Sequence, residues 1–235
     1  MTFILGADRV VIYDWKTSSK THSLVQRYAA RCRDRRPCRV DVVDWRLPES
    51  VANGIWYNGQ SLAIQDCLYR HMASSRYVVF SDIDEFLVPH GRQLTNWTQL
   101  AAALERPLSC GFQFPSAFFD PNAIPAASTA SPPDLVTMRS IQRSLHFSNI
   151  RTKCMVRPYE VFEAGIHHIS KPIWAHLTVS RVDTEVAFLH HYRNCVGMFG
   201  MNCAGTAEDA TVQRYFDELK RATTDVWNEL GNVLL

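Results

Sequence analysis

The sequence predicts an α/β fold with a mostly parallel sheet, and three observations support this class. The chain has 235 residues, 46% of them apolar, which is enough for one large domain with a buried core. Strand-like and helix-like segments alternate along its N-terminal third. Residues 77–80 (YVVF) form an apolar strand that needs cover on both faces, as strands in the middle of an α/β sheet have.

The first five elements follow one another as strand, helix, strand, helix and strand. The strands are rich in β-branched residues, and the helices repeat apolar residues at helical spacing. They are expected at residues 9–14, 21–32, 39–44, 60–73 and 77–80, with a loop at 47–59. This order requires right-handed crossovers, which make the strands parallel.

Beyond Pro89 the pattern is looser. Its expected elements are a helix at 96–104 capped by Thr95 or Asn96, an aromatic strand at 111–119, strands at 152–157 and 185–193, and an amphipathic helix at 208–230. Residues 121–133, rich in Ala, Ser and Pro, predict a mobile loop, and residues 122–133 look like a local insertion.

Charge and cysteine content narrow the class of protein. The formal charge of +2 gives no polycationic signature for nucleic acid. The five arginines between positions 31 and 39 are interpreted as a solvated helix end and loop, with a phosphate-binding patch as the alternative. The seven cysteines include no CxxC pair, so their spacing does not predict a zinc site. Cys32 with Cys38 and Cys195 with Cys203 are the candidates for a short-loop disulfide.

The sequence gives few signals for the cellular compartment. Asn96-Trp97-Thr98 is an N-glycosylation sequon, a weak indication of a secretory glycoprotein. No segment reaches the ~18 consecutive apolar residues of a membrane span, and the first residues do not read as a signal peptide. We therefore expect either a cytosolic protein or one whose anchor lies outside this sequence.

Acidic groups follow the apolar strand directly. Asp82, Asp84 and Glu85 stand within four positions at its C-terminal end, where open α/β sheets bind ligands. Unpaired carboxylates at such spacing repel one another, and a bound divalent cation removes that repulsion. The pattern predicts that Asp82 and Asp84 hold a hard metal that binds a phosphate, with a salt-bridged structural pair as the alternative.

Histidines and cations in the C-terminal half add to this prediction. The histidines are His167, His168, His176, His190 and His191, and two of them end a predicted strand. Lys153, Arg157 and Arg193 are donors suited to phosphate or carboxylate. Metal ligands and cations around one sheet edge indicate a site for a diphosphate leaving group.

Several segments, taken together, resemble glycosyltransferase family 92, the former DUF23 family. They are GADRVVIYD (6–14), Gln60-x4-Gln65-Asp66-Cys67, VFSDIDEFL (79–87), KCMVRP (153–158), GIH (165–167) and HHYR (190–193). They occur in the family's order from Gly6 to Arg193, which makes the set far more specific than the Asp-x-Asp alone.

The resemblance implies a GT-A fold, in which a Rossmann-like, mostly parallel central sheet is flanked by helices. It implies a single domain over 1–235, with a nucleotide-sugar and metal half at 1–110 and an acceptor half at 111–235. It also implies Mn²⁺ or another divalent metal, a UDP-sugar donor such as UDP-galactose, and inverting β-transfer to a glycan or polysaccharide. Members of the family are type II Golgi membrane proteins, and they carry an N-terminal strand and an anchor that this sequence is expected to lack.

The resemblance also assigns roles to individual residues. Asp82 and Asp84 match the DxD motif, in which Asp84 would bind the metal and Asp82 the ribose or the metal. His167 is the first choice to complete the metal shell and His191 the second. Lys153 and Arg193 are candidates for the diphosphate, and the other donor-binding candidates in the matching segments are Tyr13, Asp14, Gln60, Asp66 and Arg157.

Inverting transfer needs a base that takes the proton of the acceptor hydroxyl. The acidic candidates are Glu85, Asp120 and Glu163, and a buried structural role is the alternative for Glu85. A sugar acceptor stacking on Phe118 or Phe119 would lie beside Asp120, although core packing is the commoner role of such aromatics.

Two other functions stay open at this point. A nucleotidyltransferase or phosphohydrolase uses a similar acidic strand end, but the sequence has no glycine-rich phosphate loop. A catalytically inactive sugar-binding or partner-binding module is the other alternative.

Overall fold

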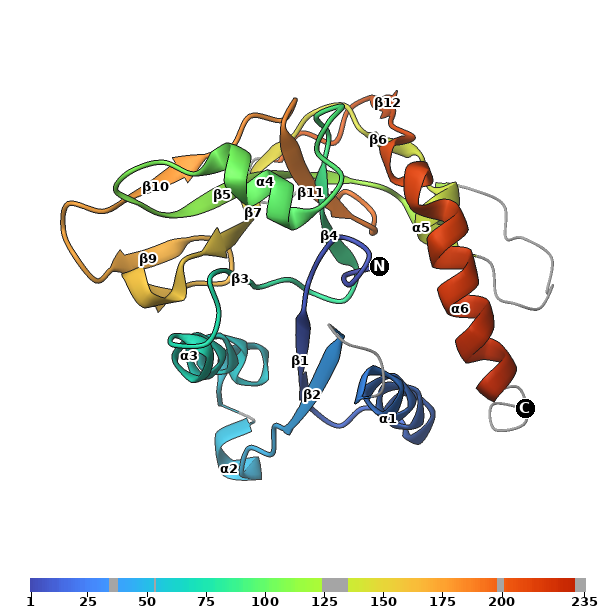
Figure 1. The fold of residues 1–235 in the computed structure, drawn as a ribbon, viewed down its shortest axis with the longest axis horizontal. Helices are drawn as coiled ribbons and strands as arrows, with labels where there is room; N and C mark the ends of the chain where they lie inside the picture. The colour runs from blue at the N-terminus through green and yellow to red at the C-terminus, as the bar shows by residue number, and fades with distance from the viewer. Residues whose placement is uncertain (34–37, 53, 124–134, 198–200, 231–235) are drawn as a thin grey trace.

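Two separate sheets organise the chain (Figure 1). The computed structural model describes residues 1–33, 38–52, 54–123, 135–197 and 201–230. The smaller sheet pairs β1 (Arg9–Asp14) with β2 (Arg39–Asp44) in parallel, with Asp14 opposite Asp44 at the C-terminal end. The helix α1 (Ser19–Arg33) connects these strands, so the first predicted strand–helix–strand unit is confirmed.

The predicted loop after β2 contains two short helices. They are α2 (Glu49–Ala52) and the 3₁₀ turn η1 (Trp56–Gly59). Gly59 then adopts a left-handed conformation with φ of 76°, and α3 (Gln60–His71) begins at the next residue. This tight entry places Gln60 at the first position of α3.

The larger sheet has six strands in the order β3-β7-β5-β11-β4, with β10 alongside β5. Its strands are β3 (Val78–Val79), β4 (Glu85–Pro89), β5 (Ser109–Phe118), β7 (Ser148–Val156), β10 (Thr178–Arg181) and β11 (Ala187–His191). The strand β5 pairs in parallel with β10 and β11, whereas β3 with β7, β5 with β7, and β4 with β11 are antiparallel. The expectation of a mostly parallel sheet is therefore wrong for this sheet, while the α/β class holds.

The reason lies in the connections. Strand–helix alternation continues only as far as α4 (Trp97–Leu104), which Asn96 caps as one of the two predicted residues. Among the described residues between α4 and α6 (Phe216–Leu230), the helical segments are short turns, namely η2 (Pro121–Ala123), α5 (Val136–Arg139), η3 (Pro158–Glu160) and η4 (Thr211–Tyr215). The expected series of strand–helix–strand crossovers, which makes neighbouring strands parallel, therefore stops at α4.

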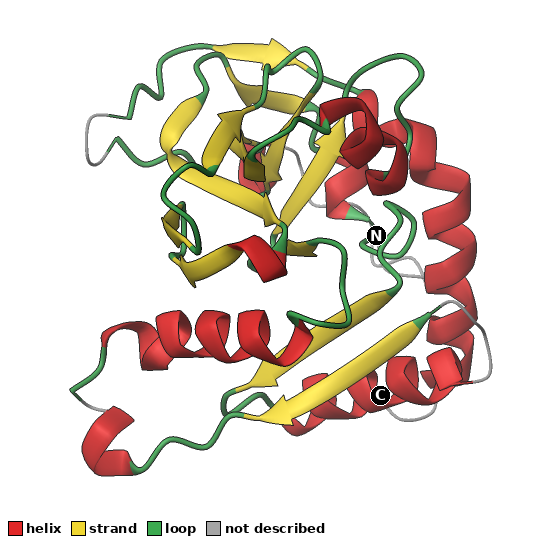
Figure 2. Cartoon of the chain, turned by 60° about the vertical axis from the view of Figure 1, so that its left-hand side comes forward, coloured by secondary structure: helices red, strands yellow, loops and turns green. Residues whose placement is uncertain are grey.

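Two small antiparallel pairs flank the larger sheet. They are β6 (Gln142–Ser144) with β12 (Thr206–Glu208), and β8 (Val161–Ala164) with β9 (Ile169–Pro172). Figures 1 and 2 show α6 running along one side of the molecule from the larger sheet to α1. An ion pair of 2.7 Å between Arg31 and Asp225 joins α1 to α6.

Alternation along β4 and β11 sorts their side chains onto two faces. Leu87 and Leu189 lie opposite each other and pack into the core cluster beneath α4. Phe188 belongs to another cluster, together with Phe119 and Tyr192. Each of these two strands therefore presents side chains to two different environments.

Both predicted short-loop disulfides are present. The Cα atoms are 4.9 Å apart in Cys32–Cys38 and 5.7 Å apart in Cys195–Cys203, and the free thiols are Cys67, Cys110 and Cys154. Within the described residues, no helix combines the length and the apolar character that a membrane span needs. Most of the predicted mobile loop and part of the arginine cluster lie outside the described residues.

Candidate active site

The acidic residues form a tight turn between β3 and β4. The amide of Glu85 donates to the carbonyl of Asp82 at 3.1 Å, and Glu85 Oε2 accepts from the amide of Asp82 at 2.8 Å. Because this turn begins soon after Val79, the strand is shorter than predicted. The side chains of Asp82 and Asp84 are each 42% exposed, so both carboxylates face outward.

Lys153 on β7 neutralises two of these carboxylates. Its ammonium lies 3.2 Å from Asp82 Oδ2 and 3.0 Å from Glu85 Oε2, and its side chain is only 3% exposed. The other oxygen of Asp82 accepts from Gln60 Nε2 at 2.8 Å. Asp82 is therefore held from two sides, by β7 and by the start of α3.

Glu85 is buried at the first position of β4. Its side chain is 0% exposed, and burial raises the pKa of this carboxyl, with Lys153 acting in the opposite direction. This position agrees with the structural alternative for Glu85 more closely than with a base that must reach a substrate.

Asp84 lies beside His191, the last residue of β11. His191 is opposite Glu85 in the antiparallel register, and its Nε2 is 3.5 Å from Asp84 Oδ2. Burial lowers the pKa of His191, so the imidazole is neutral at pH 7, although Asp84 opposes the shift. Asp84 and His191 together present an oxygen and an unprotonated nitrogen, which fit one divalent cation.

His167 occupies a different environment from His191. Its Nδ1 donates to the carbonyl of Thr152 at 3.0 Å, and its Nε2 faces the guanidinium of Arg151 at 3.4 Å. Burial lowers the pKa of His167. The four predicted metal ligands do not gather closely, since among the described residues only His90, His190 and Asp209 bring three such ligand atoms within 4.8 Å of one another.

A cavity of about 1880 Å³ separates the two sheets and reaches the acidic turn. Six of the predicted site residues line it, namely Tyr13, Asp14, Gln60, Asp82, Glu85 and Lys153. This volume exceeds the ~300–1,000 Å³ of ordinary ligand pockets, so the cavity has room for a nucleotide.

Hydrogen bonds fix the wall of the cavity that β1 and α3 form. The hydroxyl of Tyr13 donates to Asp66 at 2.6 Å, and Arg70 holds the same carboxylate at 2.6 Å. Arg70 and Tyr13 lower the pKa of Asp66. The carboxylate of Asp14 forms a hydrogen bond with His22, and this contact lowers the pKa of Asp14. Tyr13 and Asp66 therefore join the smaller sheet to α3.

Three other predicted residues follow the ends of β7, β11 and β5. Arg157 contacts Tyr77, Glu105 and Glu160, and Arg193 is exposed after β11. Asp120 follows β5 and accepts from the amide of Asn122 at 2.8 Å.

The aromatic residues before Asp120 are not exposed. Phe118 is 5% exposed and Phe119 is 0% exposed. Both pack in the core, which was the alternative to a sugar-stacking role. They offer no open platform for a sugar ring in this structure.

Sequence reasoning missed His90 and Asp209, which lie beside His190. These residues are far apart along the chain, and no local spacing links them. His90 lies outside the predicted elements, and Asp209 lies at the start of the helix predicted at 208–230.

Comparison with known proteins assigns the chain to a family. The profile of Glycosyltransferase family 92 matches residues 2–224. The beta-1,4-galactosyltransferase galt-1 of Caenorhabditis elegans is 31% identical over 156 residues, which cover 66% of this chain and 35% of that protein. The chain thus spans about a third of the length of this relative. Because the family profile matches nearly the whole chain, the chain belongs to glycosyltransferase family 92.

Proposed function

We propose that this chain transfers a hexose, with galactose as the first choice, from a UDP-sugar to a glycan or polysaccharide acceptor. Membership of the family and the galactosyltransferase name of the relative support transfer of a sugar. The observation that carries the proposal is the acidic turn, where Asp82 and Glu85 border the cavity and Asp84 stands beside His191.

Asp84 and His191 are the residues we assign to a divalent metal, with Mn²⁺ as the first choice. The neutral imidazole and the exposed carboxylate support this pair over His167, whose Nε2 faces Arg151. When bound, the cation would offset negative charge on the diphosphate leaving group. Asp82 would contact the ribose or the metal, and its carboxylate is held in place for this role by Gln60 and Lys153.

The donor would occupy the cavity between the sheets. Tyr13 and Asp14 at the end of β1 would lie toward the nucleoside, and Gln60 toward the acidic turn. Arg193, exposed two residues after His191, is the better placed candidate for the diphosphate, because Lys153 already neutralises Asp82 and Glu85. Asp66 and Arg157 would serve as supporting residues, since each is engaged with neighbouring side chains.

The catalytic base we assign is Asp120. It is only half-buried, whereas Glu85 is enclosed, and it follows β5, whose last residue Phe118 pairs with His191. A carboxylate there would accept the proton of the acceptor hydroxyl as that oxygen attacks the anomeric carbon opposite the diphosphate, which gives inversion and a β-linkage.

We infer a Golgi-lumenal location for this domain. Two disulfides are typical of proteins that fold in an oxidising compartment. Association with the membrane would then depend on an anchor outside the described residues.

Incubating the protein with Mn²⁺, a panel of UDP-sugars and a glycan acceptor tests the proposal. We expect transfer from one UDP-hexose, with UDP-galactose preferred, and a β-linked product by NMR. Release of phosphate without sugar transfer would support a phosphohydrolase instead. Binding of sugars without turnover would support an inactive binding module, and either result would contradict the proposal.

A further inference from the structure

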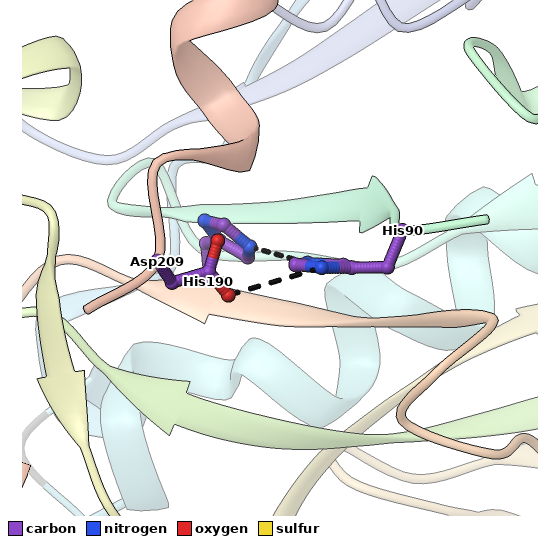
Figure 3. A group of neighbouring side chains, drawn as sticks. All are labelled: His90, His190 and Asp209. Atoms are coloured by element: carbon purple, nitrogen blue, oxygen red, sulfur yellow. Dashed lines mark hydrogen bonds and ion pairs between the residues drawn. The ribbon is translucent and has the colours of Figure 1, made fainter. Parts of the chain in front are cut away.

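A second group of ligand atoms lies on the opposite face of β4 and β11 from Glu85 and His191. Figure 3 shows His90 at the end of β4, His190 on β11, and Asp209 before α6. The Nε2 atoms of the two histidines are 2.9 Å apart, and Asp209 Oδ2 lies 3.8 Å from His90 Nδ1 (Figure 3). Because side chains alternate along a strand, His190 points away from the face that carries His191.

Aromatic stacking fixes both imidazole rings. His190 is fully buried, with ring centroids 4.3 Å from Phe119 and 4.8 Å from Phe188. His90 stacks on Phe188 at 3.9 Å. The two Nε2 atoms therefore face each other at hydrogen-bond distance, so one of them carries the shared proton, and burial keeps both imidazoles neutral by lowering their pKa values.

We propose that His90, His190 and Asp209 bind one divalent transition-metal ion of the zinc type. Two imidazole nitrogens and a carboxylate oxygen are a common donor set for tetrahedral zinc, with a fourth position for water. Nitrogens at the usual Zn–N distance lie about 3.3 Å apart in a tetrahedron, so the histidines need to separate by a few tenths of an ångström, and the Nε2 proton between them moves to Nδ1 of the same ring. The site joins the larger sheet to the segment before α6 and does not depend on the proposed sugar transfer.

Neighbouring groups support the ligands and also limit the affinity. The backbone amide of Thr211 donates to Asp209 Oδ1 at 3.0 Å, and the side-chain hydroxyl of Thr211 lies 3.2 Å from His90 Nδ1. Arg143 Nε lies 3.5 Å from Asp209 Oδ2 and competes with a cation for that oxygen. We therefore expect Arg143→Gln to tighten metal binding, whereas a purely structural hydrogen-bond network would gain nothing from it.

Cobalt(II) provides a direct test, because a tetrahedral Co²⁺ site absorbs visible light far more strongly than an octahedral one. The test uses metal-free full-length Asp84→Asn protein, because this substitution removes a ligand of the other proposed metal site. The protein is titrated with Co²⁺. We expect an intense visible band that saturates at one equivalent and disappears when one equivalent of Zn²⁺ is added. Absence of this band would overturn the proposal, whatever the fate of any further variant.

Variants then locate the band. His90→Gln on the same background should abolish it, whereas His176→Gln, at an exposed histidine, should leave it unchanged. A band that persists in folded His90→Gln protein would place the metal elsewhere and overturn the assignment. Zn²⁺ should also raise the melting temperature of the wild type but not that of His90→Gln.

Discussion

Lys153 is the buried cation that holds the acidic turn in place. It contacts Asp82 and Glu85, and Glu85 has no solvent access. Lys153→Met leaves this carboxylate buried without its partner, which typically costs about 3–5 kcal/mol in the free energy of unfolding. Urea unfolding of the variant at pH 7 measures the loss.

A second substitution separates charge from packing. Glu85→Gln in the Lys153→Met background removes the uncompensated charge, so it should recover part of the lost stability. The control, Lys171→Met, changes an exposed lysine and should have little effect. A loss below about 1 kcal/mol for Lys153→Met would show that the pair does not stabilise the turn.

At the scale of single elements, α4 depends on its cap. Asn96 Oδ1 accepts from the amide of Gln99 at 2.9 Å. Asn96→Ala should lower the free energy of unfolding by about 1 kcal/mol, because an amide at the helix start loses its acceptor. Thr98→Ala is the matched control: it also destroys the glycosylation sequon, but it keeps the cap. Equal stability of the two variants in urea would contradict the capping role.

The two disulfides determine how many thiols should react before and after reduction. Protein produced in an oxidising compartment and unfolded without reductant should expose three reactive thiols, those of Cys67, Cys110 and Cys154. After reduction all seven cysteines should react. Alkylation followed by mass spectrometry gives both numbers. Seven thiols without reductant would argue against both bridges and against the inferred compartment.

At the scale of the whole molecule, buried histidines make the fold sensitive to acid. Burial lowers the pKa values of His90, His167, His190 and His191 below 6.5. The unfolded chain then binds more protons than the native state as the pH falls through this value. Stability must therefore fall on acidification, by about 1.4 kcal/mol for each unit by which one histidine is shifted.

Glu85 acts in the opposite direction, since its raised pKa favours the folded state at low pH. Four imidazoles outweigh one carboxyl, so the free energy of unfolding should decrease from pH 7.5 to pH 5.5 in urea titrations. His90→Gln should reduce this pH dependence, and the exposed His176→Gln should not. A flat profile would show that the histidines titrate normally.

Local patterns in the sequence predicted what depends on neighbours along the chain. The strand at Arg9–Asp14, the helix that begins at Gln60 and the acidic residues directly after a short apolar strand were all expected, because each follows from residues close in sequence. The sequence could not show that Lys153 would neutralise Asp82, or that His90 would meet His190. Those contacts depend on strand order, and the mixed order of the larger sheet differs from the parallel order expected from the sequence.

The central claim is that Asp84 helps to bind a metal that in turn binds the nucleotide, and thermal denaturation with Mn²⁺ and UDP tests it. For the wild type, UDP should raise the melting temperature only when Mn²⁺ is present, by the equivalent of about 2.7 kcal/mol at a hundred times its Kd. Asp84→Asn should melt like the wild type without ligands, because the side chain is exposed, and should show no rise. Asp217→Asn, an exposed control on α6, should respond like the wild type. Full UDP binding by folded Asp84→Asn, or no response of the wild type, would contradict the claim.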